Sequence, residues 1–279
     1  MERLRVLYSS WGRDVDREKG FIEFLGKNGF DGIEFSLDYP YCHTRNPPKE
    51  FLADIEREGF IYGLHLPWRD LSLASPIPEV REASVQVIKR CVEMLSGLNP
   101  LYFLTHLTTD QTDCGFRDKE CINAGIESLR ELMPLIDELG VELVVETTHN
   151  RCCGGEEQIP YVLDAVENAF VCLDIPHLLS RRMIRWGEFY DPVTLIEELP
   201  PIVLERIRVI HIHGYRVDLN NRAVYTHFLP RPEEVEAILN KLSKVGVLRN
   251  VKAAVIESFR DTQGSESTIR RIVREVHKF

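Results

Sequence analysis

The stretch VCLDIPHL, residues 171–178, is a short apolar run that ends in an acidic residue and, three positions later, a histidine. Similar short apolar runs recur along the whole chain, at residues 4–8, 32–35, 61–64, 101–105, 143–146, 209–213 and 253–257. Several are rich in Val, Ile, Leu and Phe without strict alternation, which is typical of parallel strands covered on both faces. Segments with helical spacing separate them, for example at residues 16–28, 78–97, 119–140, 160–168 and 232–245.

Eight such β–α units in a chain of 279 residues predict a closed (β/α)₈ TIM barrel, a fold that typically takes about 250 residues. Glycines follow several helical segments where a left-handed residue would end the helix, namely Gly29, Gly59, Gly140 and Gly246. The alternative, an open doubly wound sheet, lacks the G-x-G-x-x-G pattern after its first strand. We therefore predict a single TIM-barrel domain over residues 1–279.

Composition excludes several classes of protein. The chain is 44% hydrophobic and 28% charged, as expected for a globular protein with an ample core. It has no apolar run of about 18 residues, so no membrane span is expected. Its formal charge of −10 argues against DNA, because extended nucleic-acid binding needs Lys and Arg. A small anionic substrate held by a few arginines remains compatible with this charge.

The seven cysteines fit no zinc-knuckle spacing. Cys152 and Cys153 are adjacent, and a bridge between neighbours would be strained, so free thiols are expected. The start of the chain lacks the features of a signal peptide. Together these observations favour a reducing, cytoplasmic location.

Polar side chains end nearly every predicted strand after the first. In TIM barrels active sites form at these carboxyl ends. A single histidine or glutamate there is ordinarily a structural residue, but so many on one face favour a metal centre, because buried unpaired carboxylates are costly. Mixed carboxylates and imidazoles suit zinc, manganese or iron. The residues are Glu34, His65, His106, Glu146, Asp174, His177, His211, His213 and Glu257.

The motif Asp174-Ile-Pro-His177 and the order of the other candidate ligands resemble the xylose-isomerase-like TIM barrels. That family includes sugar isomerases and epimerases and endonuclease IV-type phosphodiesterases. In the isomerases and epimerases, one metal is held by residues that match Glu146, Asp174, His211 and Glu257. In the endonuclease IV type, further metals use residues that match His65, His106, His177 and His227. The resemblance implies two or three divalent ions, zinc or manganese, with Glu146, Glu257 and His177 as catalytic residues.

Two departures from the family pattern affect function. The endonuclease type has an aspartate two residues before the last histidine, and here that position is Tyr225, which puts a third ion in doubt unless Asp218 replaces the carboxylate. The epimerases have a second glutamate six residues after the metal-binding one, and here that position is Cys152. Proton abstraction next to a carbonyl would lack its usual second base.

Further residues are candidates for substrate contact. Arg181, Arg182 and Arg185 follow the sixth strand, where they either bind a phosphate or form a solvated helix start. His213 is either a substrate contact or a supporting residue behind the ligands. Trp68 and Trp11 follow predicted strands and either pack on a substrate or belong to the core. His43 and His149 are expected to be solvated.

Two classes of enzyme use these ligands. A phosphodiesterase would use close metals to activate a water, whereas an isomerase would need one metal and paired carboxylates. Because His65, His106 and His227 are unnecessary to an isomerase, we predict a metal-dependent hydrolase of a small nucleotide-like phosphodiester, for which a cobamide is a candidate. The alternatives are a sugar or sugar-phosphate isomerase or epimerase, and a barrel that binds a ligand without catalysis. The oligomeric state stays open.

Overall fold

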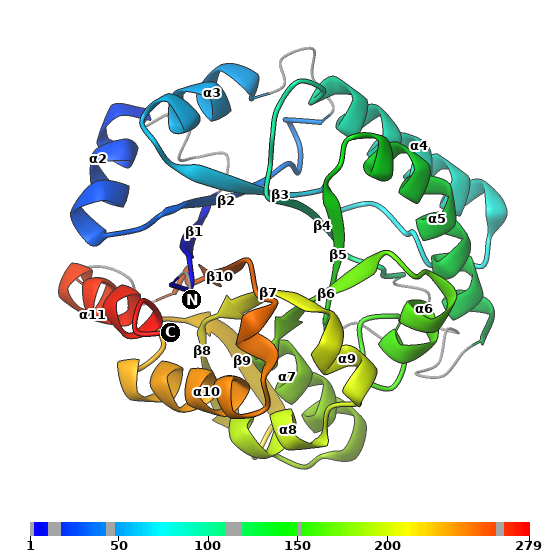
Figure 1. Ribbon diagram of the computed structural model, residues 1–279. Helices are drawn as coiled ribbons and strands as arrows, with labels where there is room; N and C mark the ends of the chain where they lie inside the picture. Colours follow the sequence, from blue (N-terminus) through cyan, green and yellow to red (C-terminus); the bar gives the residue numbers. More distant parts are fainter. Residues whose placement is uncertain (1–2, 11–17, 43–47, 110–118, 150–151, 261–264) are drawn as a thin grey trace.

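The computed structural model describes residues 3–10, 18–42, 48–109, 119–149, 152–260 and 265–279. Eight parallel strands close into a barrel in the order β1-β10-β7-β6-β5-β4-β3-β2, which confirms the predicted (β/α)₈ TIM barrel (Figure 1). That residues 1–279 form one domain stays a prediction. The barrel strands are β1 (Val6–Ser10), β2 (Gly32–Ser36), β3 (Ile61–His65), β4 (Tyr102–Thr105), β5 (Glu142–Glu146), β6 (Ala169–Asp174), β7 (Ile207–Ile212) and β10 (Ala253–Ile256).

Helices surround the strand ring (Figure 1). The predicted helical segments are confirmed to within a few residues, and the glycines expected to end helices have positive φ, for example +66° at Gly140 and +80° at Gly246. The helices are α2 (Glu18–Asn28), α3 (Lys49–Arg57), α4 (Pro78–Met94), α5 (Lys119–Glu138), α6 (Ile159–Ala165), α7 (Ile175–Trp186), α8 (Pro192–Glu198), α9 (Pro201–Arg206), α10 (Pro232–Lys244), the 3₁₀ turn η1 (Val247–Arg249) and α11 (Glu266–Val276).

The core has two layers because both faces of the strand ring are covered. The larger layer lies between the strands and the helices. The smaller one fills the barrel interior and contains Leu7, Tyr102, Leu104, Val144, Cys172, Val209, Ala253 and Val255. Strands buried on both faces need apolar residues on both, which explains the absence of strict alternation in the sequence. Because apolar side chains fill the barrel interior, polar side chains gather at the strand ends.

A short antiparallel hairpin lies outside the ring, next to α7 (Figure 1). It consists of β8 (Gly214–Asp218) and β9 (Ala223–Phe228) and follows directly after β7. The apolar pattern predicts a seventh strand that extends to residue 213, and it does not predict this hairpin.

The expectation of free thiols is wrong for two pairs of cysteines. Cys42 is bonded to Cys91, with their Cα atoms 5.0 Å apart, and Cys152 is bonded to Cys153. Cys42 and Cys91 are 49 residues apart, so only the fold reveals that α4 brings them together. Cys172 is the free cysteine among the described residues. No described helix has the length and apolar character needed to cross a membrane.

Candidate metal centre

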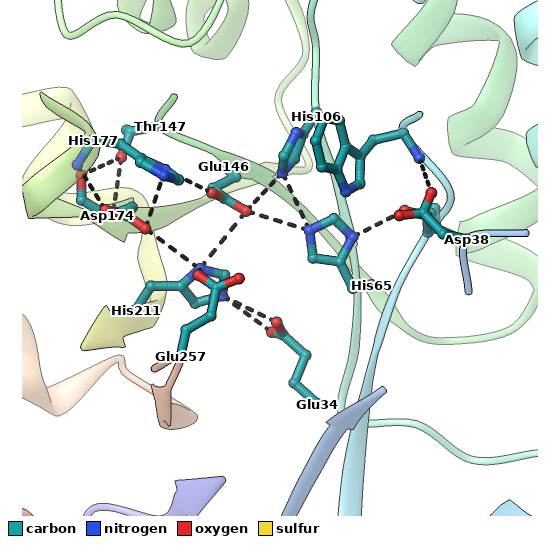
Figure 2. A network of polar contacts seen from close by, with 12 residues as sticks. Glu34, Asp38, His65, His106, Glu146, Thr147, Asp174, His177, His211 and Glu257 are labelled. Atoms are coloured by element: carbon teal, nitrogen blue, oxygen red, sulfur yellow. Dashed lines mark hydrogen bonds and ion pairs between the residues drawn. The ribbon is translucent and has the colours of Figure 1, made fainter. Parts of the chain in front are cut away.

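Side chains from the carboxyl ends of the strands converge at one mouth of the barrel (Figure 2). His65 is the last residue of β3, Glu146 of β5 and Asp174 of β6, while His211 is the penultimate residue of β7. Because parallel strands of a barrel end on the same face, alignment of the strands alone brings these residues together. The cluster comprises His65, His106, Glu146, Asp174, His177, His211, His213, His227 and Glu257.

Glu146 lies at the centre of the cluster and is 2% exposed. Its Oε2 atom is 2.9 Å from Nε2 of His106 and 3.4 Å from Nε2 of His65. Its Oε1 atom is 3.2 Å from Nδ1 of His177 (Figure 2). Burial opposes ionisation of this carboxyl group, but the charges of His106 and His211 hold its pKa well below the usual value. Glu146 is therefore an ionised carboxylate that faces two groups of ligands.

His65 and His106 form the first group with Glu146. Nδ1 of His65 lies 2.9 Å from the carbonyl oxygen of Leu66 and carries the proton it donates there, so Nε2 of the neutral ring has a free lone pair. This Nε2 lies only 3.2 Å from Nε2 of His106. Burial lowers the pKa of His106, whereas contact with Glu146 outweighs burial and raises the pKa of His65 to about 9. A proton or a metal ion must lie between these atoms, and the three residues could hold an ion.

The second group joins Glu146 to Asp174, His211 and Glu257. Nδ1 of His211 is 3.2 Å from Oε2 of Glu257 and 3.7 Å from carboxylate oxygens of both Glu146 and Asp174. Nδ1 of His211 and Oε2 of Glu257 are buried and form no hydrogen bond. Buried polar atoms are costly when unpaired, and three buried carboxylates repel one another. A divalent cation would pair these atoms and neutralise the charge, so the residues fit a metal ion.

His213 supports the ligands instead of joining them. Its Nδ1 accepts the backbone N–H of His227 at 3.1 Å, so the proton is on Nε2, which donates to Oδ2 of Asp174 at 2.9 Å. Both ring nitrogens are thus occupied. A histidine that holds a ligating carboxylate fixes the orientation of that carboxylate. This geometry favours the supporting role over the substrate contact.

His177 and His227 form a third group, with their Nε2 atoms 3.3 Å apart. The expected carboxylate is missing, because Tyr225 on β9 is 44% exposed and Asp218 does not replace it. Asp218 instead accepts hydrogen bonds from the backbone N–H and side-chain amide of Asn221 and so closes the hairpin turn. His213 is close enough to join this pair in holding an ion, but its Nε2 already donates to Asp174. His177 and His227 are therefore the donors of an incomplete third metal site.

Glutamates bind each of the three arginines of α7. Arg181, which is fully buried, donates to Glu157 at 2.7 Å, and Arg185 donates to the same carboxylate. Arg182 donates to Glu156 at 2.8 Å and also to Glu198. Because these guanidinium groups are committed to carboxylates, the contacts do not support the expected binding of a substrate phosphate. They hold α7 to the segment after β5.

Trp68 lies at the edge of the metal centre. Its ring stacks on His106 with centroids 4.8 Å apart, and its backbone N–H donates to Asp38. Arg69 lies 4.8 Å above the same indole. His149, expected to be solvated, is exposed, and its ring lies edge-on to His177. Trp11 and His43 fall outside the described residues.

Several supporting residues are not predicted by the sequence pattern. The hydroxyl of Thr147 accepts the backbone N–H of Asp174 at 2.8 Å. Phe259 stacks on His227, with centroids 5.0 Å apart. Asp38 accepts a 2.7 Å hydrogen bond from Arg69. Thr147 directly follows Glu146, and Phe259 lies two residues after Glu257. This proximity in sequence to candidate ligands is the signal that could have identified them.

Comparisons with known proteins agree with this fold. The family model described as "Xylose isomerase-like TIM barrel" matches residues 22–274, so the chain belongs to the xylose isomerase-like TIM barrels. A comparison with curated protein sequences finds no match.

Solved structures similar to this chain include two kinds of enzyme. A D-tagatose 3-epimerase-like protein is 17% identical, with a TM-score of 0.71 over 99% of both chains. Endonuclease IV from Thermus thermophilus is also 17% identical, with a TM-score of 0.65 over 99% of this chain and 100% of that one. A xylose isomerase-like TIM barrel protein from Mycobacterium smegmatis, solved in complex with magnesium, is 13% identical, with a TM-score of 0.69 over 99% and 97%. At these identities the likeness shows the fold.

Proposed function

We propose that this protein is a metal-dependent hydrolase of a small phosphodiester and uses two divalent ions, zinc or manganese. His65, His106 and Glu146 would hold the first ion. Glu146, Asp174, His211 and Glu257 would hold the second, so that Glu146 would be a ligand of both. The mixture of imidazole and carboxylate ligands supports zinc or manganese.

The observation that carries the proposal is the position of the His65–His106 pair. Their Nε2 atoms and Oε2 of Glu146 all lie within 3.4 Å of one another, on the side of Glu146 away from Asp174. The epimerases that the sequence resembles need no ion there. In addition, the position that would carry their second acid is Cys152, which is buried and bonded to Cys153.

Two close divalent ions supply an activated water and stabilise the attacking and leaving oxygens of a phosphodiester. The chain would supply the proton for the leaving oxygen from His177 and His227. Burial lowers the pKa of His227 to about 4, whereas the charge of Asp174 and the contact with Glu146 outweigh burial and raise that of His177 to about 9. The Nε2 atoms of this pair lie 3.3 Å apart, close enough for a proton to pass between them.

The proposed substrate is a small anionic molecule with a planar or apolar part, a description that a cobamide would meet. The partly exposed ring of Trp68 offers a surface for the planar part. Arg69, whose side chain is 52% exposed, lies next to it and donates to Asp38 at 2.7 Å. The formal charge of −10 disfavours long DNA, since each phosphate would need a cationic partner.

A second candidate function is the epimerisation or isomerisation of a sugar. The complete set Glu146, Asp174, His211 and Glu257 favours it, because that set matches the single-metal site of the epimerases. The solved structures with this fold include a D-tagatose 3-epimerase-like protein and an L-ribulose 3-epimerase.

Metal analysis of anaerobically purified protein, combined with turnover of bis(p-nitrophenyl) phosphate and of D-tagatose, tests the proposal. We expect two ions per chain and phosphodiesterase activity that His65→Ala abolishes. One ion per chain, with sugar epimerisation that survives His65→Ala, would establish the second candidate instead.

A further inference from the structure

Glu34 is a buried carboxylate that the proposed catalytic chemistry does not use. It lies on β2, is 1% exposed, and points into the barrel below the metal centre (Figure 2). An ionised side chain in such a position needs partners of its own, because burial of an unpaired charge is costly. Its partners are Tyr102 and His211.

Tyr102 holds Glu34 from one side. Its hydroxyl donates to Oε2 of Glu34 at 2.8 Å, and its ring is fully buried. The ring reaches Glu34 by passing over Gly63, the residue paired with Glu34 on the neighbouring strand β3. A Cβ atom at position 63 would lie 2.3 Å from Cζ and 2.5 Å from the hydroxyl of Tyr102. Glycine is therefore required there for this contact.

His211 holds Glu34 from the other side. Nε2 of His211 is 3.1 Å from Oε1 and 3.3 Å from Oε2 of Glu34. Since a carboxylate only accepts, the proton of the imidazole is on Nε2. Nδ1 is then the nitrogen that remains for another partner; it lies 3.2 Å from Glu257 and is the buried atom that forms no hydrogen bond.

We propose that Glu34 is a positioning residue for the second metal ion, acting through His211. It fixes the imidazole in the Nε2–H form and in one orientation, so that Nδ1 is available to the ion. It also makes His211 a stronger donor to the ion. Tyr102 and Gly63 keep Glu34 in place. This inference rests on the metal centre of the proposed function, and it adds a residue that touches neither the ions nor the substrate.

The experiment measures zinc affinity by competition with a fluorescent chelator, for the wild type and for Glu34→Gln. Glutamine keeps the size of the side chain and an oxygen that accepts from His211, but it removes the charge. Changes in such supporting groups typically weaken metal binding about 10- to 100-fold. We expect that loss for one of the two ions and wild-type affinity for the other, which His65 and His106 bind. Tyr102→Phe, which keeps Glu34 but removes one hydrogen bond, should give a smaller loss.

Glu142→Gln is the matched control, because Glu142 is at the opposite end of β5, where it pairs with Lys252. It should leave both zinc affinities unchanged. Histidine ¹⁵N chemical shifts of the zinc-loaded protein give a second measurement that does not depend on activity. In that state His211 should carry its proton on Nε2 in the wild type and lose this preference in Glu34→Ala.

The outcomes separate the two proposals. A wild-type protein that binds no zinc would overturn the proposed function itself. A wild type that binds two ions, with a Glu34→Gln variant of equal affinity for both, would overturn the role of Glu34 alone. A proton on Nδ1 of His211 in the zinc-loaded wild type would overturn it as well.

Discussion

Replacement of Glu146 by glutamine tests the bridging position directly. The side chain keeps its shape, but its charge is lost, and the amide offers one oxygen where the carboxylate offered two. In the structure Oε2 faces both proposed ion sites, 2.9 Å from Nε2 of His106 and 3.7 Å from Nδ1 of His211, while Oε1 lies 3.2 Å from Nδ1 of His177. Glutamine keeps only one oxygen for these contacts and brings no charge to either ion.

The expected loss of zinc affinity follows from the free energy of such contacts. A hydrogen bond or ion contact to a charged group is worth about 1.5–3 kcal/mol, and about 1.4 kcal/mol corresponds to a tenfold change in affinity. We therefore expect zinc binding to weaken roughly 10- to 100-fold for both ions in Glu146→Gln. Turnover of a phosphodiester should be lost almost completely, because the ions no longer share a ligand.

The assay is zinc titration with a chelator, followed by turnover at saturating zinc. Glu257→Gln is the matched comparison, because Glu257 pairs with His211 and His227, on the side of the cluster away from His65 and His106. It should weaken one ion only. If Glu146→Gln retained both ions at wild-type affinity with full turnover, Glu146 would not be a bridging ligand.

Three further predictions concern the surroundings of the metal centre. Arg182→Ala should lower the free energy of unfolding by about 3–5 kcal/mol in denaturant titrations, because it leaves the buried carboxylate of Glu156 unpaired, while metal content stays unchanged; wild-type stability would contradict this. In the metal-free protein the pKa values of His65 and His177 are raised to about 9 from 6.5, so their contribution to the free energy of unfolding is complete below pH 6.5 and is lost as the pH rises through 9. Denaturant titrations of the metal-free protein should therefore give a lower free energy of unfolding at pH 9 than at pH 6, and a higher value at pH 9 would refute this. Tyr225→Asp should add a third zinc ion per chain, and unchanged stoichiometry would show that the missing carboxylate is not what limits this site.

The barrel and the position of its candidate metal ligands could be predicted from the sequence because both depend on local patterns. A strand buried on both faces gives an apolar run, and the residue that ends the run lies at the mouth of the barrel. The pattern alone therefore predicts that Glu146, Asp174 and His211 lie at this mouth, and the structure brings them together, with carboxylate oxygens of both acids 3.7 Å from Nδ1 of His211.

What could not be predicted depends on side-chain partners far away in the sequence. Arg182 is an ordinary surface residue by pattern, but the fold places Glu156 against it, 26 positions earlier. Similarly, nothing in the sequence around His211 indicates that its Nε2–H donates a hydrogen bond to Glu34, 177 positions away. Which nitrogen of a histidine remains free is a property of such distant contacts, so the sequence yields the type of ligand but not its orientation.

The chain leaves the barrel at the start of the β8–β9 hairpin and returns to almost the same point at its end. A Cβ atom on Gly214, its first residue, would lie only 2.8 Å from the carbonyl oxygen of Leu229, which directly follows β9. The ring of eight strands closes without either hairpin strand. Consequently, we expect the barrel to stay closed when the segment that carries His227 is lengthened or replaced by a short turn. Such a change would not act on His227 alone, because the backbone N–H of His227 donates to His213, which in turn donates to Asp174.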